Sequence, residues 1–116
     1  MPMLYHITER AAWEEALRQG VYRADSLARE GFIHASTVEQ VTRTADRRFR
    51  GQSGLLLLAI DPERLRAEVR YEAADGEIFP HIYGPLNHDA AVRVLPFEPG
   101  ADGRFTLPEE SAHDAG

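Results

Sequence analysis

Three of the five histidines lie inside apolar, strand-like segments, an unusual setting for an ionisable side chain. His6 lies in MLYHITE (residues 3–9), His34 in EGFIHAST (residues 30–37) and His81 in IFPHIYGPL (residues 78–86). Alternate residues of a strand share a face, which puts Ser36 beside His34 and Tyr83 beside His81. A single buried histidine is usually a core residue that hydrogen-bonds a backbone carbonyl. Three of them near strand ends, each beside polar or aromatic residues, indicate a shared site.

Metal binding and serine chemistry are the first two candidates for such a site. A zinc site would need imidazoles about 2 Å from the ion. The chain has no HxH or HExxH spacing, so we expect no bound metal, and a metal-dependent hydrolase using His6, His34 and His81 is the weakest interpretation. Ser36 is on the same strand face as His34, but no GxSxG elbow surrounds it, which disfavours a serine nucleophile.

Carboxylates are the third candidate chemistry. Glu72, Asp75 and Glu77 shortly precede FPHIYG. One of them could stabilise a developing cation or position a sugar hydroxyl, although a solvated acidic loop is the simpler interpretation.

The first half of the chain predicts two strand-to-helix units. A strand over residues 3–7 is followed by a helix over residues 9–19, with Thr8 as its N-cap and Gly20 as its stop. DSLAREG is expected to be a turn and residues 32–35 a short strand. Ser36 with Glu39, and Thr37 with Gln40, are two overlapping capping boxes, so the second helix should begin there and run to about residue 50.

The second half is mainly extended. LLLLAI (residues 55–60) is typical of a central strand covered on both faces. AEVRYE, FPHIYG, AAVRVLPF and RFTL should be further strands, and PEESAHDAG resembles a disordered tail. Because strands and helices mix without a strict βαβ alternation, the chain predicts an α+β fold with one or two sheets. We expect one globular domain over residues 1–108 and a flexible tail over residues 109–116.

Composition and charge exclude several classes of protein. The 116 residues contain no cysteine and no apolar run of membrane-spanning length, and the start does not resemble a secretion signal, so we expect a cytoplasmic protein. The formal net charge is −6. Residues 1–60 carry eight arginines and seven acidic residues, while residues 61–116 carry five and twelve. Extended nucleic-acid binding is therefore not expected, because it needs a clustered basic surface.

YHIT, EGFIHAST running on to EQV, LLLLAID and FPHIYGPL occur in an order and spacing that resembles a bacterial family, number 952 of the domain-of-unknown-function series. The resemblance spans about residues 4–97. It implies an ADP-ribosyltransferase-like fold, a split β-sandwich with flanking helices around a cleft for NAD, similar to that of RNA 2′-phosphotransferases.

The resemblance also implies roles for individual residues. His6 would contact the NAD ribose, and His34, with Ser36 and Thr37, would lie beside the nicotinamide half. The third catalytic position, usually acidic, falls on Glu77 by order along the chain, or on His81 instead. Thr8 and Tyr83 complete the expected ligand-binding residues. The arginines near the motifs are too few to favour a phosphotransferase.

Two functional interpretations follow. The first is a domain that binds NAD or a related nucleotide and transfers ADP-ribose to an unidentified acceptor. The second is a non-catalytic nucleotide-binding or ligand-binding module that keeps the cleft without the third catalytic residue.

Overall fold

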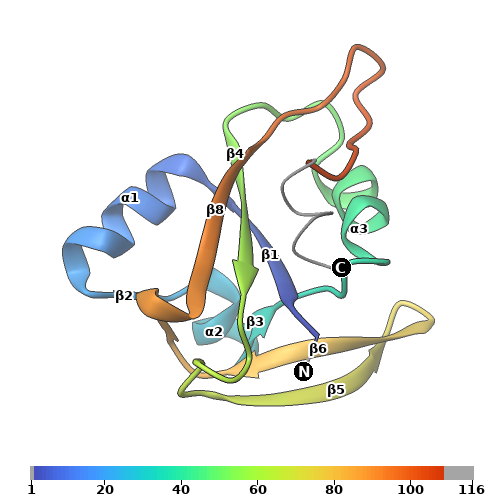
Figure 1. Cartoon of the computed structure of the whole chain (residues 1–116). Coiled ribbons are helices and arrows are strands. Elements are labelled where there is room, and N and C mark those ends of the chain that lie inside the picture. The colour runs from blue at the N-terminus through green and yellow to red at the C-terminus, as the bar shows by residue number, and fades with distance from the viewer. Residues whose placement is uncertain (1, 109–116) are drawn as a thin grey trace.

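The computed structural model describes residues 2–108 as an α+β fold with three antiparallel sheets. Figure 1 shows three strands of one sheet, β1 (Leu4–Glu9), β4 (Leu55–Ile60) and β8 (Ala91–Phe97), side by side in the order β1-β4-β8. A second sheet has the order β3-β6-β5, and β2 and β7 form a two-stranded pair. No helix in the described part of the chain is long and apolar enough to cross a membrane.

The leucine-rich strand β4 is the centre of the core. All six of its residues are buried, as expected of a strand covered on both faces. Its even-numbered residues pack with Trp13 and Ala16 of α1 (Arg10–Gln19). Its odd-numbered residues pack with Val41 and Ala45 of α3 (Val41–Arg48). The two-residue period of a strand therefore divides the core into two clusters, one on each side of β4.

The second sheet brings two of the expected histidines together. β3 (Ile33–His34) pairs antiparallel with β6 (Glu77–Tyr83) in a register that sets His34 directly opposite His81. β5 (Glu68–Ala74) pairs with the other edge of β6. The β5–β6 hairpin turns at Asp75 and Gly76, which both have positive φ, as a tight hairpin turn requires.

Short elements complete the chain. Helix α2 spans Asp25–Glu30, β2 spans Val21–Tyr22, β7 spans Leu86–Asn87, and a 3₁₀ helix covers His88–Ala90. The prediction of a turn at DSLAREG was therefore wrong, because Asp25–Glu30 forms a full helical turn that Gly31 ends in a left-handed conformation. RFTL was also wrongly predicted, since residues 104–107 form no strand. The tail predicted over residues 109–116 lies outside the described residues.

Two of the predicted N-caps, Thr8 and Ser36, are wrong. Thr8 belongs to β1, and the cap of α1 is Glu9, which makes no capping side-chain bond. Ser36 pairs with Tyr5 of β1 through two backbone hydrogen bonds, so it extends the sheet and starts no helix. α3 begins only at Val41 and ends at Arg48. One half of the expected capping box does form, because the Gln40 side chain accepts a hydrogen bond from the Thr37 N–H at 3.0 Å.

Candidate functional site: a histidine-lined cleft

A cleft of about 460 Å³ opens between the two larger sheets. Its walls come from β1, β3, the segment from β2 into α2, α3 and the β5–β6 turn. His6, His34 and His81 all line this cleft. Its volume lies within the roughly 300–1,000 Å³ of small-molecule sites.

His6 is a buried, neutral group on the cleft floor. Its Nδ1 lies 2.5 Å from the carbonyl oxygen of His34, which can only accept, so Nδ1 carries the proton. Its Nε2 lies 2.8 Å from the Tyr22 hydroxyl, which is also 3.0 Å from Thr8 Oγ1. Burial lowers the pKa of His6 to about 4, against an ordinary 6.5. In this neutral ring Nε2 accepts from Tyr22, so His6 is held in one tautomer.

His34 is more open to solvent than His6. Its side chain is 33% exposed, and Nε2 lies 3.1 Å from Glu30 Oε2 at the end of α2. That contact, more than any other, holds the pKa of Glu30 below its ordinary value. The Phe32 ring meets His34 edge-on at 4.9 Å. His34 therefore has a backbone carbonyl that supports His6 and a side chain at the cleft edge.

His81 is buried, with its ring fixed on two sides. Phe32 stacks on it at a centroid distance of 4.0 Å, and the His34 ring lies edge-on at 5.7 Å. Its Nδ1 is 2.8 Å from Glu72 Oε1, which also accepts a 2.5 Å hydrogen bond from the Tyr83 hydroxyl. The hydrogen bond from Tyr83, followed by that of His81, lowers the pKa of Glu72. Tyr83 itself does not line the cleft.

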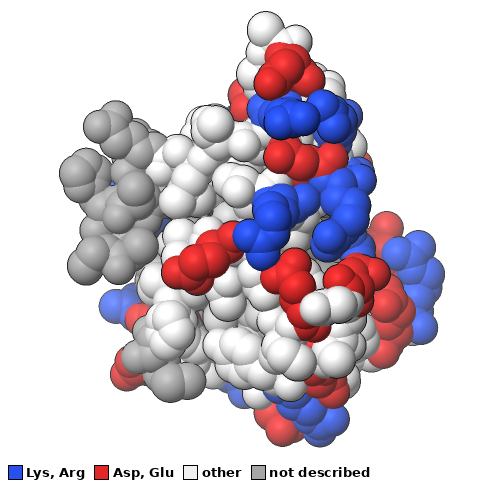
Figure 2. Space-filling model, turned by 90° about the vertical axis from the view of Figure 1, so that its right-hand side faces the viewer, with Lys and Arg blue, Asp and Glu red and all other residues white. Residues whose placement is uncertain are grey.

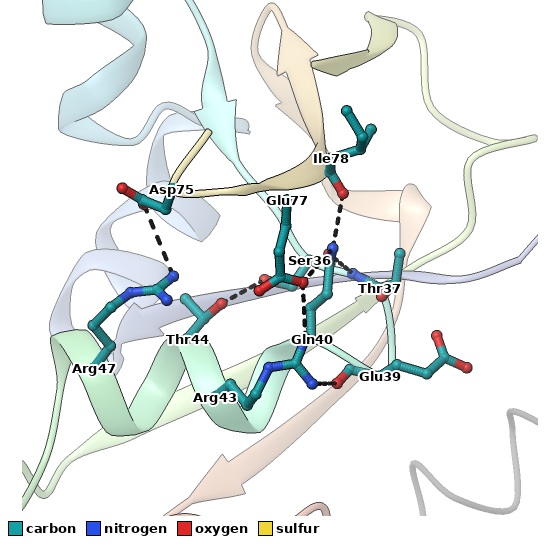
Figure 3. A network of polar contacts seen from close by, with 10 residues as sticks. All are labelled: Ser36, Thr37, Glu39, Gln40, Arg43, Thr44, Arg47, Asp75, Glu77 and Ile78. Carbon is teal, nitrogen blue, oxygen red and sulfur yellow. Dashed lines mark hydrogen bonds and ion pairs between the residues drawn. The ribbon is translucent and has the colours of Figure 1, made fainter. Parts of the chain in front are cut away.

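Glu77 does not reach the cleft. Figure 3 shows its carboxylate at the start of β6, where Arg43 binds it at 2.8 Å and Gln40 Nε2 donates to it at 3.3 Å. Gln40 also donates to the Ile78 carbonyl at 2.7 Å. Thr37, whose N–H binds Gln40, is outside the lining as well. These residues join α3 to the hairpin, whereas Ser36, 3.3 Å from Thr44 Oγ1, does line the cleft.

Arginines surround the cleft at its rim. Four of them line it: Arg23, Arg29, Arg47 and Arg48. Asp75 lies 3.9 Å from Arg47 and 3.5 Å from Arg48, linking α3 to the hairpin turn. Figure 2 shows arginine and acidic side chains interleaved on one face of the molecule. The exposed guanidinium groups of Arg23 and Arg29 make no hydrogen bond or ion pair with any described residue.

Comparison with known proteins establishes the family. The family model described as "Protein of unknown function (DUF952)" matches residues 7–94. The chain belongs to the DUF952 family. No curated protein matches it.

Two solved structures of the protein CC0527 from Caulobacter crescentus are similar to this DUF952 chain. The crystal structure has 38% sequence identity and a TM-score of 0.86, over 95% of this chain and 98% of that one. The solution NMR structure has 37% identity and a TM-score of 0.74, over 97% of each chain.

The structure adds residues to the DUF952 cleft that sequence reasoning missed, Arg47 and Arg48 among them. Tyr22, Arg23 and Arg29 were not expected at the site. Arg29 was missed because residues 25–31 were predicted as a turn, and its place on α2 could not be foreseen without that helix. Tyr22 gave no local signal, since only the fold brings β2 beside His6. Across the described residues, no three histidine or acidic side chains are arranged to hold a metal ion.

Proposed function

We propose that the cleft binds a nucleotide, with NAD as the first candidate. The observation that carries this proposal is the division of the cleft into a neutral polar floor and a rim where four arginines outnumber the three lining carboxylates, Glu9, Asp25 and Asp75. A nucleotide has the same division, with sugar hydroxyls at one part and phosphates at another.

The floor suits a neutral group such as a ribose. His6, Tyr22 and Thr8 form a connected set of ring nitrogens and hydroxyls, and burial keeps the imidazole uncharged. Hydroxyl groups both donate and accept hydrogen bonds, so Thr8 and Tyr22 can exchange a bond with each other for one with a sugar hydroxyl.

The rim suits phosphates. Arg23 and Arg29 have no hydrogen-bond or ion-pair partner among the described residues, although the chain as a whole carries a net charge of −6. Guanidinium groups bind phosphate through two parallel hydrogen bonds. Arg47 and Arg48 are already opposite Asp75, which makes Arg23 and Arg29 the better phosphate ligands.

NAD is the first candidate because of the motifs that carry the histidines. YHIT and EGFIHAST resemble the first two core-strand motifs of the ADP-ribosyltransferase-like fold. That likeness favours ADP-ribose transfer as the activity of the cleft.

A non-catalytic nucleotide-binding module is the second candidate. The position of Glu77 favours it, because its carboxylate lies outside the cleft and binds Arg43 and Gln40. The acidic residue expected at the third catalytic position is therefore not supplied by Glu77.

Calorimetric titration tests the nucleotide proposal with three probes: NAD, ADP-ribose and nicotinamide riboside, which lacks the diphosphate. The double variant Arg23→Ala, Arg29→Ala should weaken NAD and ADP-ribose roughly tenfold or more, since hydrogen bonds to charged groups contribute about 1.5–3 kcal/mol. Binding of nicotinamide riboside should change little. Arg104→Ala is the matched control, an exposed arginine outside the cleft lining. Absence of binding by all three probes would overturn the proposal.

A further inference from the structure

The hydrogen bonds of the cleft histidines divide them into two kinds. His6 uses both ring nitrogens, one on the His34 carbonyl and one on Tyr22. His34 places Nε2 on the exposed carboxylate of Glu30, and its Nδ1 has no hydrogen-bond partner among the described residues. His81 has the same pattern as His34, with Nδ1 on the carboxylate of Glu72 and Nε2 without a hydrogen-bond partner among the described residues, but of these two only His81 is buried.

The proton on His81 is located by its partner. The pKa of Glu72 is lowered by the hydrogen bonds from Tyr83 and His81, so the carboxylate stays ionised and can only accept. Nδ1 of His81 must therefore carry a proton, and in the neutral ring Nε2 carries the lone pair. Because His81 lines the cleft and its Nδ1 is on Glu72, Nε2 is the ring nitrogen available to a bound molecule.

The surroundings of His81 fix the orientation of its ring. Phe32 stacks on one face at 4.0 Å, and His34 closes the edge. Tyr83 holds Glu72 at 2.5 Å, and the guanidinium of Arg70 lies 4.3 Å from the centroid of the Tyr83 ring. A carboxylate that fixes the tautomer of a neutral histidine is the arrangement by which proteins prepare a general base.

We propose that His81 is a general base of this cleft, with Glu72 and Tyr83 as its positioning residues. This role rests on the proposed binding of NAD. His81 accepts the proton released in a nucleophilic substitution at the ribose carbon that bears nicotinamide. The oxygen of water or of an acceptor hydroxyl forms a bond to that carbon, and its proton moves to Nε2 of His81. The bond from the carbon to the nicotinamide nitrogen breaks, and nicotinamide leaves with the electron pair.

The residue proposed here is His81, whereas the order of residues along the chain had favoured Glu77. Glu77 is bound by Arg43 and Gln40 outside the cleft, whereas His81 reaches the cleft from the same strand, β6. Glu72 belongs to the neighbouring strand β5, so the pairing of β5 with β6 brings together the base and its carboxylate.

Release of nicotinamide from NAD, measured against pH for the full chain, is the first test. Positioned general bases contribute about 10²–10⁴-fold, so His81→Asn should lower the maximal rate by roughly 100-fold or more. Glu72→Gln should lower the maximal rate and shift the pH profile with little change in KM. Glu68→Gln, an exposed carboxylate on the same strand, is the matched control and should stay within about twofold of the parent rate. Binding of NAD without release of nicotinamide, or equal rates in all four proteins, would overturn the role of His81 and leave the nucleotide-binding proposal standing.

A second measurement needs no nucleotide. Diethyl pyrocarbonate reacts with the lone pair of a neutral imidazole, and mass spectrometry locates the product. We expect His81 to be modified at Nε2 while His6 stays protected, and NMR of ¹⁵N-labelled imidazoles should show the proton of His81 on Nδ1 in the parent protein. If NAD fails to bind, the proposed function falls, and reactivity of His81 still supports a base open to the cleft. An unreactive His81, or a proton on Nε2, would refute that base directly.

Discussion

The side chain of His6 binds the backbone of His34, with Nδ1 donating to the carbonyl oxygen at 2.5 Å. The side chain of His6 is therefore linked to His34 through the backbone carbonyl of His34, and not through its ring. One consequence is a separation of roles, because the His34 side chain can be replaced while its carbonyl continues to hold His6. The two positions should respond differently to substitution.

Stability should depend on His6 as the pH falls. The folded-state pKa of His6 is about 4, below the ordinary 6.5, so between these values the unfolded chain binds a proton that the folded chain does not. The free energy of unfolding should therefore decrease from pH 6.5 to about 4, by at most roughly 3 kcal/mol from this residue, and level off below. His6→Asn, which keeps a donor for the His34 carbonyl but cannot titrate, removes this contribution. Urea unfolding of both proteins across this pH range gives the difference between their free energies of unfolding. The contributions of the carboxylates, which both proteins share, cancel in this difference. If the two free energies change with pH in parallel, His6 is not kept neutral by folding.

Replacement of His34 should affect binding more than stability. Its side chain is partly exposed and its ion-pair partner Glu30 is on the surface, a kind of pair that contributes little. His34→Gln should leave the melting temperature nearly unchanged and weaken NAD binding. Calorimetry and thermal unfolding measure the two effects separately. A large fall in melting temperature with unchanged affinity would make His34 a structural residue.

The sequence predicted the parts of this protein that local pattern controls. LLLLAI reads as a buried central strand because every residue is apolar, and it is one. The end of α1 at Gly20 was also expected, because glycine commonly ends a helix, and the structure has Gly20 there in a left-handed conformation. The family resemblance was confirmed, while the ADP-ribosyltransferase-like fold stays a prediction.

Long-range pairing decided what sequence reasoning missed. Thr8 and Ser36 have the side chains of helix caps, but strand pairing with β4 and Tyr5 used their backbones instead. Glu77 was placed by order along the chain, and its distance from the cleft depends on Arg43, a residue far away in sequence. The pairing of His81 with Glu72 likewise depends on the register of β5 against β6, which no local pattern specifies.

Truncation of the central strand should destabilise both core clusters. Leu57 and Leu58 are fully buried and face opposite sides of β4. Leu57→Ala and Leu58→Ala should each lower the free energy of unfolding by about 2–5 kcal/mol, because each leaves a cavity. Leu17→Ala, at a side chain that is 51% exposed, should change it by much less. Chemical denaturation compares the three, and a small effect at either buried position would contradict a core on both faces.

Gln40, and not Glu77, should be the stabilising member of the polar group between α3 and the hairpin. The buried Gln40 amide accepts from the Thr37 N–H and donates to the Ile78 carbonyl, so Gln40→Ala leaves two backbone groups without partners. An unsatisfied buried group costs about 1–3 kcal/mol; both of these bonds are part-buried, so water replaces them in part and denaturation should show a loss near the lower end of that range. Glu77→Gln keeps both of these bonds and loses only the charge opposite Arg43, so it should cost less and leave NAD binding unchanged. A strong loss of nucleotide affinity in Glu77→Gln, with stability intact, would return Glu77 to the third catalytic position.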